Sequence, residues 1–227
     1  MADLKYPRTF HLPSSPGLAN DDRRLPDLSV FDRQRVIVTE KMDGESTTLT
    51  PQRNYARSAD SGYHPSRDWL KAFHARRAPD IPEGWRISGE YLFARHSVPY
   101  TRANSNALRS FFYGFGVWDS DNRFLEWDAA AEMLAMLEIE LVPVLYDGLF
   151  TPDVITRLAA SLDTTRQEGL VVRLAAGHPY PAGQSSTSRF FTGIAKWVRP
   201  GHVVSEQHWS TGPVVPNELI AGIDPTP

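Results

Sequence analysis

Short runs of β-branched and apolar residues, separated by turn-forming residues, recur along the chain and predict strands. They lie at residues 36–39, 46–50, 85–93, 111–118, 141–146, 169–174 and 194–198. The first run leads into Glu40 and Lys41 and then into Gly44, where a turn is expected. Lys41 is therefore predicted to lie at the end of a strand.

Helical spacing of apolar residues is confined to residues 66–77, 128–137 and 151–162. Ser66 and Asp128 are the expected N-caps of the first two helices, and Thr151 followed by Pro152 opens the third. Irregular spans separate the strands as often as helices do. This pattern predicts an α+β fold of largely antiparallel sheets flanked by helices.

The first thirty residues are rich in Pro, Ser and Gly and form a loop-rich lead-in. We expect one domain over residues 1–227, made of this lead-in (1–30), a core (31–205) and a C-terminal tail (206–227). The lead-in, which carries Tyr6, Arg8, His11, Ser14 and Ser15, either folds over a functional site or covers a sheet edge. We favour the sheet edge.

Composition excludes several classes of protein. The chain has 227 residues, 41% hydrophobic and 22% charged, as expected of a globular protein. It has no cysteine, which excludes disulfides and thiolate chemistry and leaves oxygen or imidazole as metal ligands. No window approaches the roughly 20 apolar residues of a membrane span, and no signal peptide is evident, so we expect a cytoplasmic protein without a membrane partner.

Charge is unevenly distributed. The formal net charge of −3 argues against a protein that coats nucleic acid by bulk electrostatics. However, residues 53–77 carry six Lys or Arg against two Asp, and residues 173–205 carry basic residues and no carboxylate. Two such segments in a slightly acidic chain indicate an anionic ligand. Walker, HExxH and GxSxG motifs are absent, and the histidines lack metal-ligand spacing.

What remains is a series of charged and aromatic residues on consecutive predicted strands. In chain order they are a Lys-x-Asp-Gly segment at 41–44, an acid in an apolar strand, an aromatic strand at 112–118, a second acid and a second lysine. Each feature alone is weak, but their order is specific. The key residues of these segments are, in order, Lys41, Glu90, Phe115, Glu168 and Lys196.

This series resembles the motifs of the covalent nucleotidyltransferases, which comprise ATP-dependent polynucleotide ligases and messenger-RNA capping guanylyltransferases. The resemblance spans residues 36–199 and is closest to the ATP-dependent RNA ligases, especially the branch of the phage nick-sealing RNA ligase. It implies the ligase adenylation-domain fold. Residues 200–227 are too few for the oligonucleotide-binding barrel that DNA ligases and capping enzymes append, so we expect none.

The resemblance also implies roles for individual residues. Lys41 would be the nucleophile that carries AMP. Asp43 and Glu168 would hold Mg²⁺. Nucleotide-binding roles fall to Glu40 at the adenine end, Arg57 on phosphate with Arg53 as its rival, Glu90 on the ribose hydroxyls, Phe115 stacked on adenine and Lys196 on the α-phosphate. Trp118 is the alternative stacking residue, but strand alternation places it on the opposite face from Phe115.

The chemistry requires an unprotonated lysine, since an amine with a pKa of ~10.4 is only about 0.1% free base near neutral pH. We expect Lys196, Arg57 and a divalent cation to lower the pKa of Lys41. One departure from the family pattern concerns its last motif, which usually has two lysines one residue apart. Here Val198 takes the second position and Arg199 follows, so either Arg199 substitutes after a bulge or Lys196 acts alone.

The resemblance therefore implies an ATP-dependent RNA ligase, active in RNA repair, that joins a 5′-phosphate to a 3′-hydroxyl through lysyl-AMP and an adenylylated RNA end. No obligatory protein partner is evident. Residues 53–77 would contact the RNA backbone with little sequence preference. The alternatives are a non-catalytic ATP or AMP sensor, a DNA-sealing enzyme and a GTP-using capping enzyme.

Overall fold

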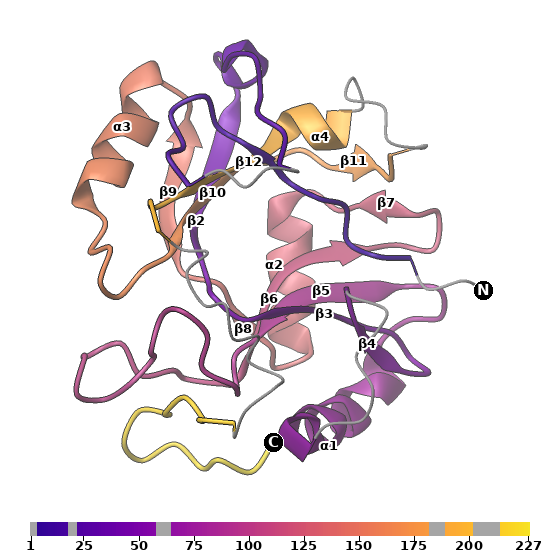
Figure 1. The fold of residues 1–227 in the computed structure, drawn as a ribbon. Helices are drawn as coiled ribbons and strands as arrows, with labels where there is room; N and C mark the ends of the chain where they lie inside the picture. The colour runs from indigo at the N-terminus through magenta and orange to yellow at the C-terminus, as the bar shows by residue number, and fades with distance from the viewer. Residues whose placement is uncertain (1–3, 18–21, 58–64, 182–188, 202–213) are drawn as a thin grey trace.

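The computed structural model describes residues 4–17, 22–57, 65–181, 189–201 and 214–227, and two sheets build its fold (Figure 1). The first sheet has the strand order β1-β12-β10-β2-β9. Its strands are β1 (Phe10–His11), β2 (Arg35–Lys41), β9 (Val144–Leu149), β10 (Gly169–Leu174) and β12 (Ile194–Val198). All neighbours in it are antiparallel except β1 and β12, which run parallel.

The second sheet has the order β11-β7-β6-β5-β3-β4, with β8 paired to β6. Only the β6–β8 pair is parallel. Its strands are β3 (Glu45–Leu49), β4 (Asn54–Ala56), β5 (Arg86–Tyr91), β6 (Phe112–Trp118), β7 (Arg123–Phe124), β8 (Glu140–Leu141) and β11 (His178–Pro179). The predicted α+β class with largely antiparallel sheets is confirmed.

Helices pack against both sheets. They are α1 (Asp68–Arg77), α2 (Trp127–Met136), α3 (Pro152–Ser161) and α4 (Arg189–Gly193), with 3-10 turns η1 (Ser29–Phe31), η2 (Pro65–Arg67) and η3 (Ala78–Asp80). One apolar cluster joins α1 and α2 to the second sheet, with Phe73, Phe112 and Leu134 at its centre. The other joins α3 and the lead-in to the first sheet, where Val38 and Ile155 are buried. No helix within the described ranges is long and apolar enough to cross a membrane.

Two predicted helix caps are wrong. Ser66 lies inside η2, one turn before α1, and its carbonyl accepts a hydrogen bond from the Tyr91 hydroxyl. Asp128 lies within α2, where its carboxylate binds the guanidinium of Arg35 instead of the helix amides. At Asp128, a long-range partner thus replaced the local cap. The third prediction is confirmed, because Thr151 precedes α3 and Pro152 is its first residue.

The lead-in connects the two sheets. Its Phe10 and His11 pair with Ala195 and Lys196 of β12, as expected for a segment that covers a sheet edge. Farther toward the N-terminus, the ring of Tyr6 packs edge-on against Phe115 of β6, with centroids 4.9 Å apart. In Figure 1 this indigo segment crosses from the second sheet to the edge of the first. The lead-in therefore covers a sheet edge and also contacts a predicted site residue.

Candidate active site

Lys41 and Glu168 meet where two strands of the first sheet pair. Lys41 ends β2 opposite Gly169, the first residue of β10, so that Glu168 lies beside the lysine. Lys41 Nζ donates a hydrogen bond to Glu168 Oε2 over 2.5 Å. The side chains are 25% and 5% exposed. The arrangement is a partly buried ion pair whose lysine still reaches solvent.

A second and a third carboxylate lie at the turn after Lys41: Asp43 belongs to the turn, and Glu90 reaches it from β5. Glu90 of β5 accepts a hydrogen bond from the Gly44 amide over 3.1 Å. The Asp43 carboxylate accepts hydrogen bonds from the Ser97 hydroxyl and the Val98 amide, both over 2.7 Å. These contacts tie the turn to β5 and to the loop that carries Ser97 and Val98, so three of the four predicted acids, Asp43, Glu90 and Glu168, gather around Lys41.

The glycines of the two motifs permit close backbone approach. A Cβ on Gly44 would collide with the carbonyl oxygen of Tyr91, and a Cβ on Gly169 would collide with that of Trp197. Both obstacles are main chain and cannot swing aside. Glycine at these positions therefore allows the strands that carry Lys41 and Glu168 to approach their neighbours.

The electrostatics at Lys41 differ from the sequence expectation. Burial lowers the pKa of Lys41, but the attraction of Glu168 and Glu90 outweighs it and leaves the pKa above its usual value. Among the side chains, the attraction of these acids therefore outweighs the lowering that we predicted from Lys196 and Arg57. Burial also raises the pKa of Glu90 to about 8, although the Lys41 ammonium opposes this shift.

Lys196 lies on β12 and faces the same side of the sheet as Lys41, because the register pairs Lys196 with Val171 and Val171 with Thr39. Its Nζ donates to Asp22 Oδ1 over 3.2 Å. Burial lowers the pKa of Lys196, and the nearby Lys41 ammonium lowers it further. The structure thus brings the two motif lysines within electrostatic reach.

The strand geometry decides whether Arg199 substitutes for the second motif lysine after a bulge or Lys196 acts alone. Pairing of β10 with β12 is regular from Gly169 opposite Val198 to Arg173 opposite Ile194. No bulge therefore turns Arg199 toward Lys196. Its amide instead donates to the Glu168 carbonyl over 3.0 Å. Lys196 is the cation that β12 presents beside Lys41.

Arg57 rather than Arg53 faces this group of charges. Burial lowers the pKa of Arg57, while Glu90 and Asp22 attract its guanidinium. Arg53 is exposed, and its guanidinium lies over the ring of Tyr55, 5.9 Å from the centroid. The residue assigned to phosphate by resemblance is the one that the fold directs inward.

Phe115 and Trp118 lie on the same side of β6, contrary to the alternation argument. The pairing of β5 with β6 shifts between Ser88, opposite Gly116, and Gly89, opposite Gly114, so Phe115 is an extra, bulged residue. Both rings contact Tyr6, at centroid distances of 4.9 and 6.2 Å. The freed carbonyl of Phe115 accepts a hydrogen bond from Arg173.

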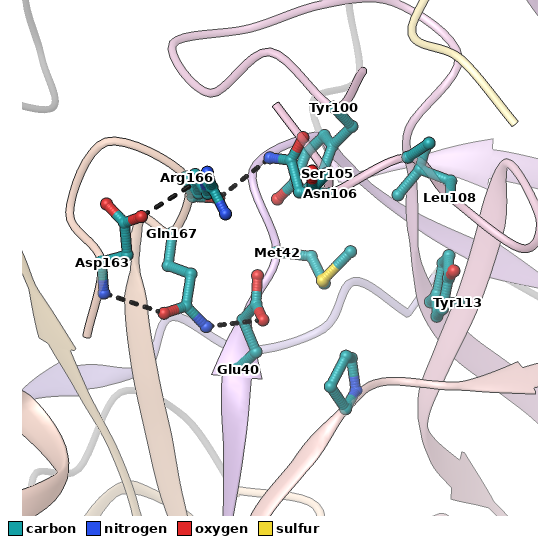
Figure 2. Close-up of a pocket in the computed structure, with 12 residues that line it drawn as sticks. Glu40, Met42, Tyr100, Ser105, Asn106, Leu108, Tyr113, Asp163, Arg166 and Gln167 are labelled. Carbon is teal, nitrogen blue, oxygen red and sulfur yellow. Dashed lines mark hydrogen bonds and ion pairs between the residues drawn. The ribbon is translucent and has the colours of Figure 1, made fainter. Parts of the chain in front are cut away.

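Glu40 is separated from the other site residues. Alternation directs its side chain to the face opposite Lys41, where Gln167 donates to its carboxylate over 2.9 Å. There it lines a cavity of about 360 Å³ beyond the end of β2. Figure 2 shows Glu40 and Gln167 on one side of this cavity and Leu108 and Tyr113 on the other. Phe115 does not line it.

Two of the six cations of residues 53–77 serve the fold. Arg67 forms an ion pair with Glu45, and both side chains are about one-tenth exposed, at 11% and 12%. Arg77 donates to the carbonyls of Leu137, Phe73 and Glu138 and lies over the Phe73 ring. Neither is available to contact RNA as predicted. The structure leaves Arg53, Lys71 and Arg76 exposed in this stretch.

Several residues at the site were not predicted from the sequence. Asp22 accepts a hydrogen bond from Lys196. Tyr100 belongs to no motif, but its hydroxyl accepts a hydrogen bond from the Asp43 amide over 2.9 Å. Arg173 donates a hydrogen bond to the backbone carbonyl of Phe115. Arg173 was visible as a cation in a segment without carboxylates, whereas Asp22 and Tyr100 lie in irregular segments that carry no pattern.

The donor chemistry of the site suits a hydrated divalent cation. Within the described part of the chain, no group of three or more His, Asp or Glu side chains is arranged to hold a metal ion. Asp43 and Glu168 each spend one carboxylate oxygen on the contacts given above. A pair of hard oxygen donors with few protein ligands is what Mg²⁺ accepts, because this ion keeps several waters.

Comparison with known proteins places this geometry in context. A model of the RNA ligase family matches residues 34–198. An archaeal ATP-dependent RNA ligase is 16% identical with a TM-score of 0.51, over 86% of this chain and 48% of that one. The Naegleria gruberi RNA ligase with pyrophosphate is 18% identical with a TM-score of 0.51, over 86% of this chain and 57% of that one. The predicted ligase fold is confirmed.

The same Naegleria gruberi ligase in a mutant form with ATP and Mn is 16% identical with a TM-score of 0.50, over 86% of this chain and 57% of that one. The chain spans about half the length of the solved ligases that it matches. Comparison with curated protein sequences found no match.

Proposed function

Because the chain belongs to the RNA ligase family, we propose that it is an ATP-dependent RNA ligase that works through a lysyl-AMP intermediate. One observation carries the proposal. Lys41, at the end of β2, contacts Glu168. Glu90 is close enough to raise the pKa of Lys41, and Lys41 is close enough to lower the pKa of Lys196. A solvent-accessible amine with an adjacent carboxylate as base, and a second cation for the phosphate, supports nucleophilic attack.

In the first step Lys41 Nζ attacks the α-phosphorus of ATP. A P–N bond forms, the bond between the α-phosphorus and its bridging oxygen breaks, and pyrophosphate leaves with that electron pair. Glu168, 2.5 Å from the amine, is the group placed to hold the proton that the amine loses. Lys196 would neutralise charge that develops on the α-phosphate.

In the later steps AMP passes from Lys41 to the 5′-phosphate of RNA, and the 3′-hydroxyl then displaces AMP to form a phosphodiester. Glu90 would bind the ribose hydroxyls, Phe115 would stack on the adenine and Arg57 would contact phosphate. Glu40 faces a separate cavity that Phe115 does not line, so we assign it no contact with this adenine. We further propose that the protein serves RNA repair in the cytoplasm.

Asp43 and Glu168 would hold Mg²⁺, which supplies charge neutralisation to phosphoryl transfer when bound. The chemistry of their oxygens supports this assignment. So does the Naegleria gruberi ligase, whose mutant form was solved with ATP and Mn. Holding a cation there would also reduce the attraction of these acids for Lys41 and thereby favour its free amine.

The decisive test is covalent labelling. Incubation with ATP radiolabelled on the α-phosphate and Mg²⁺ should label the protein, and Lys41→Ala should abolish labelling. Lys5→Ala, at an exposed lead-in lysine, is the matched control and should label like the wild type. Undiminished labelling in Lys41→Ala would end the proposal.

The labelling assay also separates the alternatives. A nucleotide sensor would bind ATP or AMP without labelling or sealing. This alternative rests on the last motif, where, within the described residues, β12 presents only one cation, Lys196, to the site instead of the usual two. Labelling by GTP in place of ATP would indicate a capping enzyme, and equal sealing of DNA and RNA 3′-hydroxyl ends would indicate a DNA-sealing enzyme.

A further inference from the structure

His11 lies at the centre of a hydrogen-bonded chain that starts in the lead-in and ends at Lys196. The ring is 0% exposed. Its Nδ1 lies 2.8 Å from the Ser15 hydroxyl, and its Nε2 lies 2.9 Å from Asp22 Oδ2. The other oxygen of Asp22 accepts the 3.2 Å hydrogen bond from Lys196 Nζ. Ser15, His11 and Asp22 thus form a buried support for a site lysine.

The directions of these hydrogen bonds follow from the donors available. The Val198 amide donates to the Ser15 hydroxyl oxygen over 3.0 Å, so the hydroxyl proton is free to point at His11 Nδ1. The network therefore assigns the proton of a neutral ring to Nε2, which donates to Asp22. This leaves both Asp22 oxygens engaged, one by His11 and one by Lys196.

We propose that Asp22, oriented by His11, is a positioning residue that holds the Lys196 ammonium in place for the α-phosphate. This inference rests on the proposed ligase function. An ammonium has three N–H donors, and Asp22 takes one of them, so two stay available to phosphate oxygens. The side chains of Asp22 and Lys196 are only 15% and 19% exposed, so water competes little for the contact.

A purely structural role for Asp22 is already filled by other contacts. Phe10 and His11 pair with β12 through the backbone, and the Leu12 amide donates to the Lys196 carbonyl over 2.8 Å. The lead-in is thus docked on β12 by its main chain. Among the described residues, it is the side chain of Asp22 that accepts a hydrogen bond from the Lys196 ammonium.

The test is a double-mutant cycle on full-length protein. Asp22→Asn keeps the shape of the side chain and removes its charge. We expect it to weaken ATP affinity, measured by calorimetry, and to slow labelling by about tenfold to a hundredfold, the range for a hydrogen bond between charged groups. In a Lys196→Met background the same substitution should change neither quantity. Asp32→Asn, at an exposed acid that follows η1, is the control and should match the wild type.

A second pair of variants tests His11. His11→Gln keeps a donor that can reach Asp22, whereas His11→Ala removes it, so His11→Gln should retain more ATP affinity than His11→Ala at matched melting temperature. Equal losses from Asp22→Asn in both Lys196 backgrounds, or tighter ATP binding by Asp22→Asn, would overturn the inference. If the wild type binds ATP but is never labelled, the proposed function fails, while the affinity cycle still decides the role of Asp22.

Discussion

Lys41, the last residue of β2, and Glu168, the residue before β10, lie side by side with Nζ and Oε2 2.5 Å apart. The pair explains why the nucleophile of the proposed reaction rests in its protonated form, since Glu168 and Glu90 together raise its pKa despite burial. Activation of the lysine therefore requires that the negative charge around it be reduced. Substrate binding with a divalent cation would do this.

The first prediction concerns the pKa of Lys41. Glu168→Gln removes the nearest negative charge, so the pKa of Lys41 should fall by about one unit or more. The measurement is NMR titration of ¹³C-labelled lysine, with the Lys41 resonance assigned by its loss in Lys41→Ala. Asp32→Asn, which removes an exposed acid outside the site, is the control and should leave the Lys41 titration as in the wild type. An unchanged or higher pKa in Glu168→Gln would contradict the electrostatic account.

The second prediction concerns stability and the pKa of about 8 at Glu90. A carboxyl whose pKa is raised by folding is favoured in its protonated form, so the free energy of unfolding falls as pH rises from about 4.5 to about 8. Glu90→Gln keeps the acceptor for the Gly44 amide and removes the titration. Its stability advantage over the wild type should therefore grow across this window, to at most about 5 kcal/mol, and then level off.

Urea denaturation at a series of pH values checks this expectation. Asp147→Asn is the opposite control, because hydrogen bonds from Arg35 lower the pKa of Asp147. That variant should lose stability relative to the wild type at neutral pH and not at low pH. A constant difference between Glu90→Gln and the wild type from pH 5 to 8 would show that Glu90 is not held in its protonated form.

The strands were predictable because buried strands appear in the sequence as runs of apolar residues. Residues 169–174 and 194–198 are uninterrupted apolar runs apart from one cation each, and β10 and β12 begin and end at these residues. The order of motifs on consecutive strands was informative for the same reason. Register then brings Lys41, Glu168 and Lys196 together without any further signal being needed.

What the sequence could not predict depends on contacts between distant segments. The bulge at Phe115 arises in the pairing of β5 with β6 and reverses the expected side of Trp118. The contact between Asp22 and Lys196 joins residues that are 174 positions apart. The sign of the Lys41 pKa shift reflects a balance of distances to acids and cations, which motif order does not contain.

The third prediction tests why glycine follows Glu168. In Gly169→Ala the new Cβ would collide with the Trp197 carbonyl, so β12 would have to move away from β10. We expect a loss of about 1–3 kcal/mol in the free energy of unfolding. Gly148→Ala on β9 is the matched control, because its Cβ would meet only the hydroxyl and ring of Tyr146, which can move. Equal stability of the two variants would show that the β10–β12 pair tolerates a side chain.

The last prediction separates stability from nucleotide binding at Arg173. This side chain is 3% exposed, forms no ion pair with any described residue, and spends its contacts on the Phe115 carbonyl and the Trp127 ring. Burying a guanidinium without a carboxylate is costly, so Arg173→Met, which keeps much of the length, should leave the free energy of unfolding unchanged or higher. Releasing the Phe115 carbonyl should loosen the bulge that orients the ring and weaken ATP affinity by about tenfold.

Arg76→Met, at an exposed arginine of α1, is the control for the loss of one positive charge and should lower neither the free energy of unfolding nor the ATP affinity. If Arg173→Met instead unfolds the protein, or binds ATP like the wild type, then Arg173 supports the core rather than the position of Phe115.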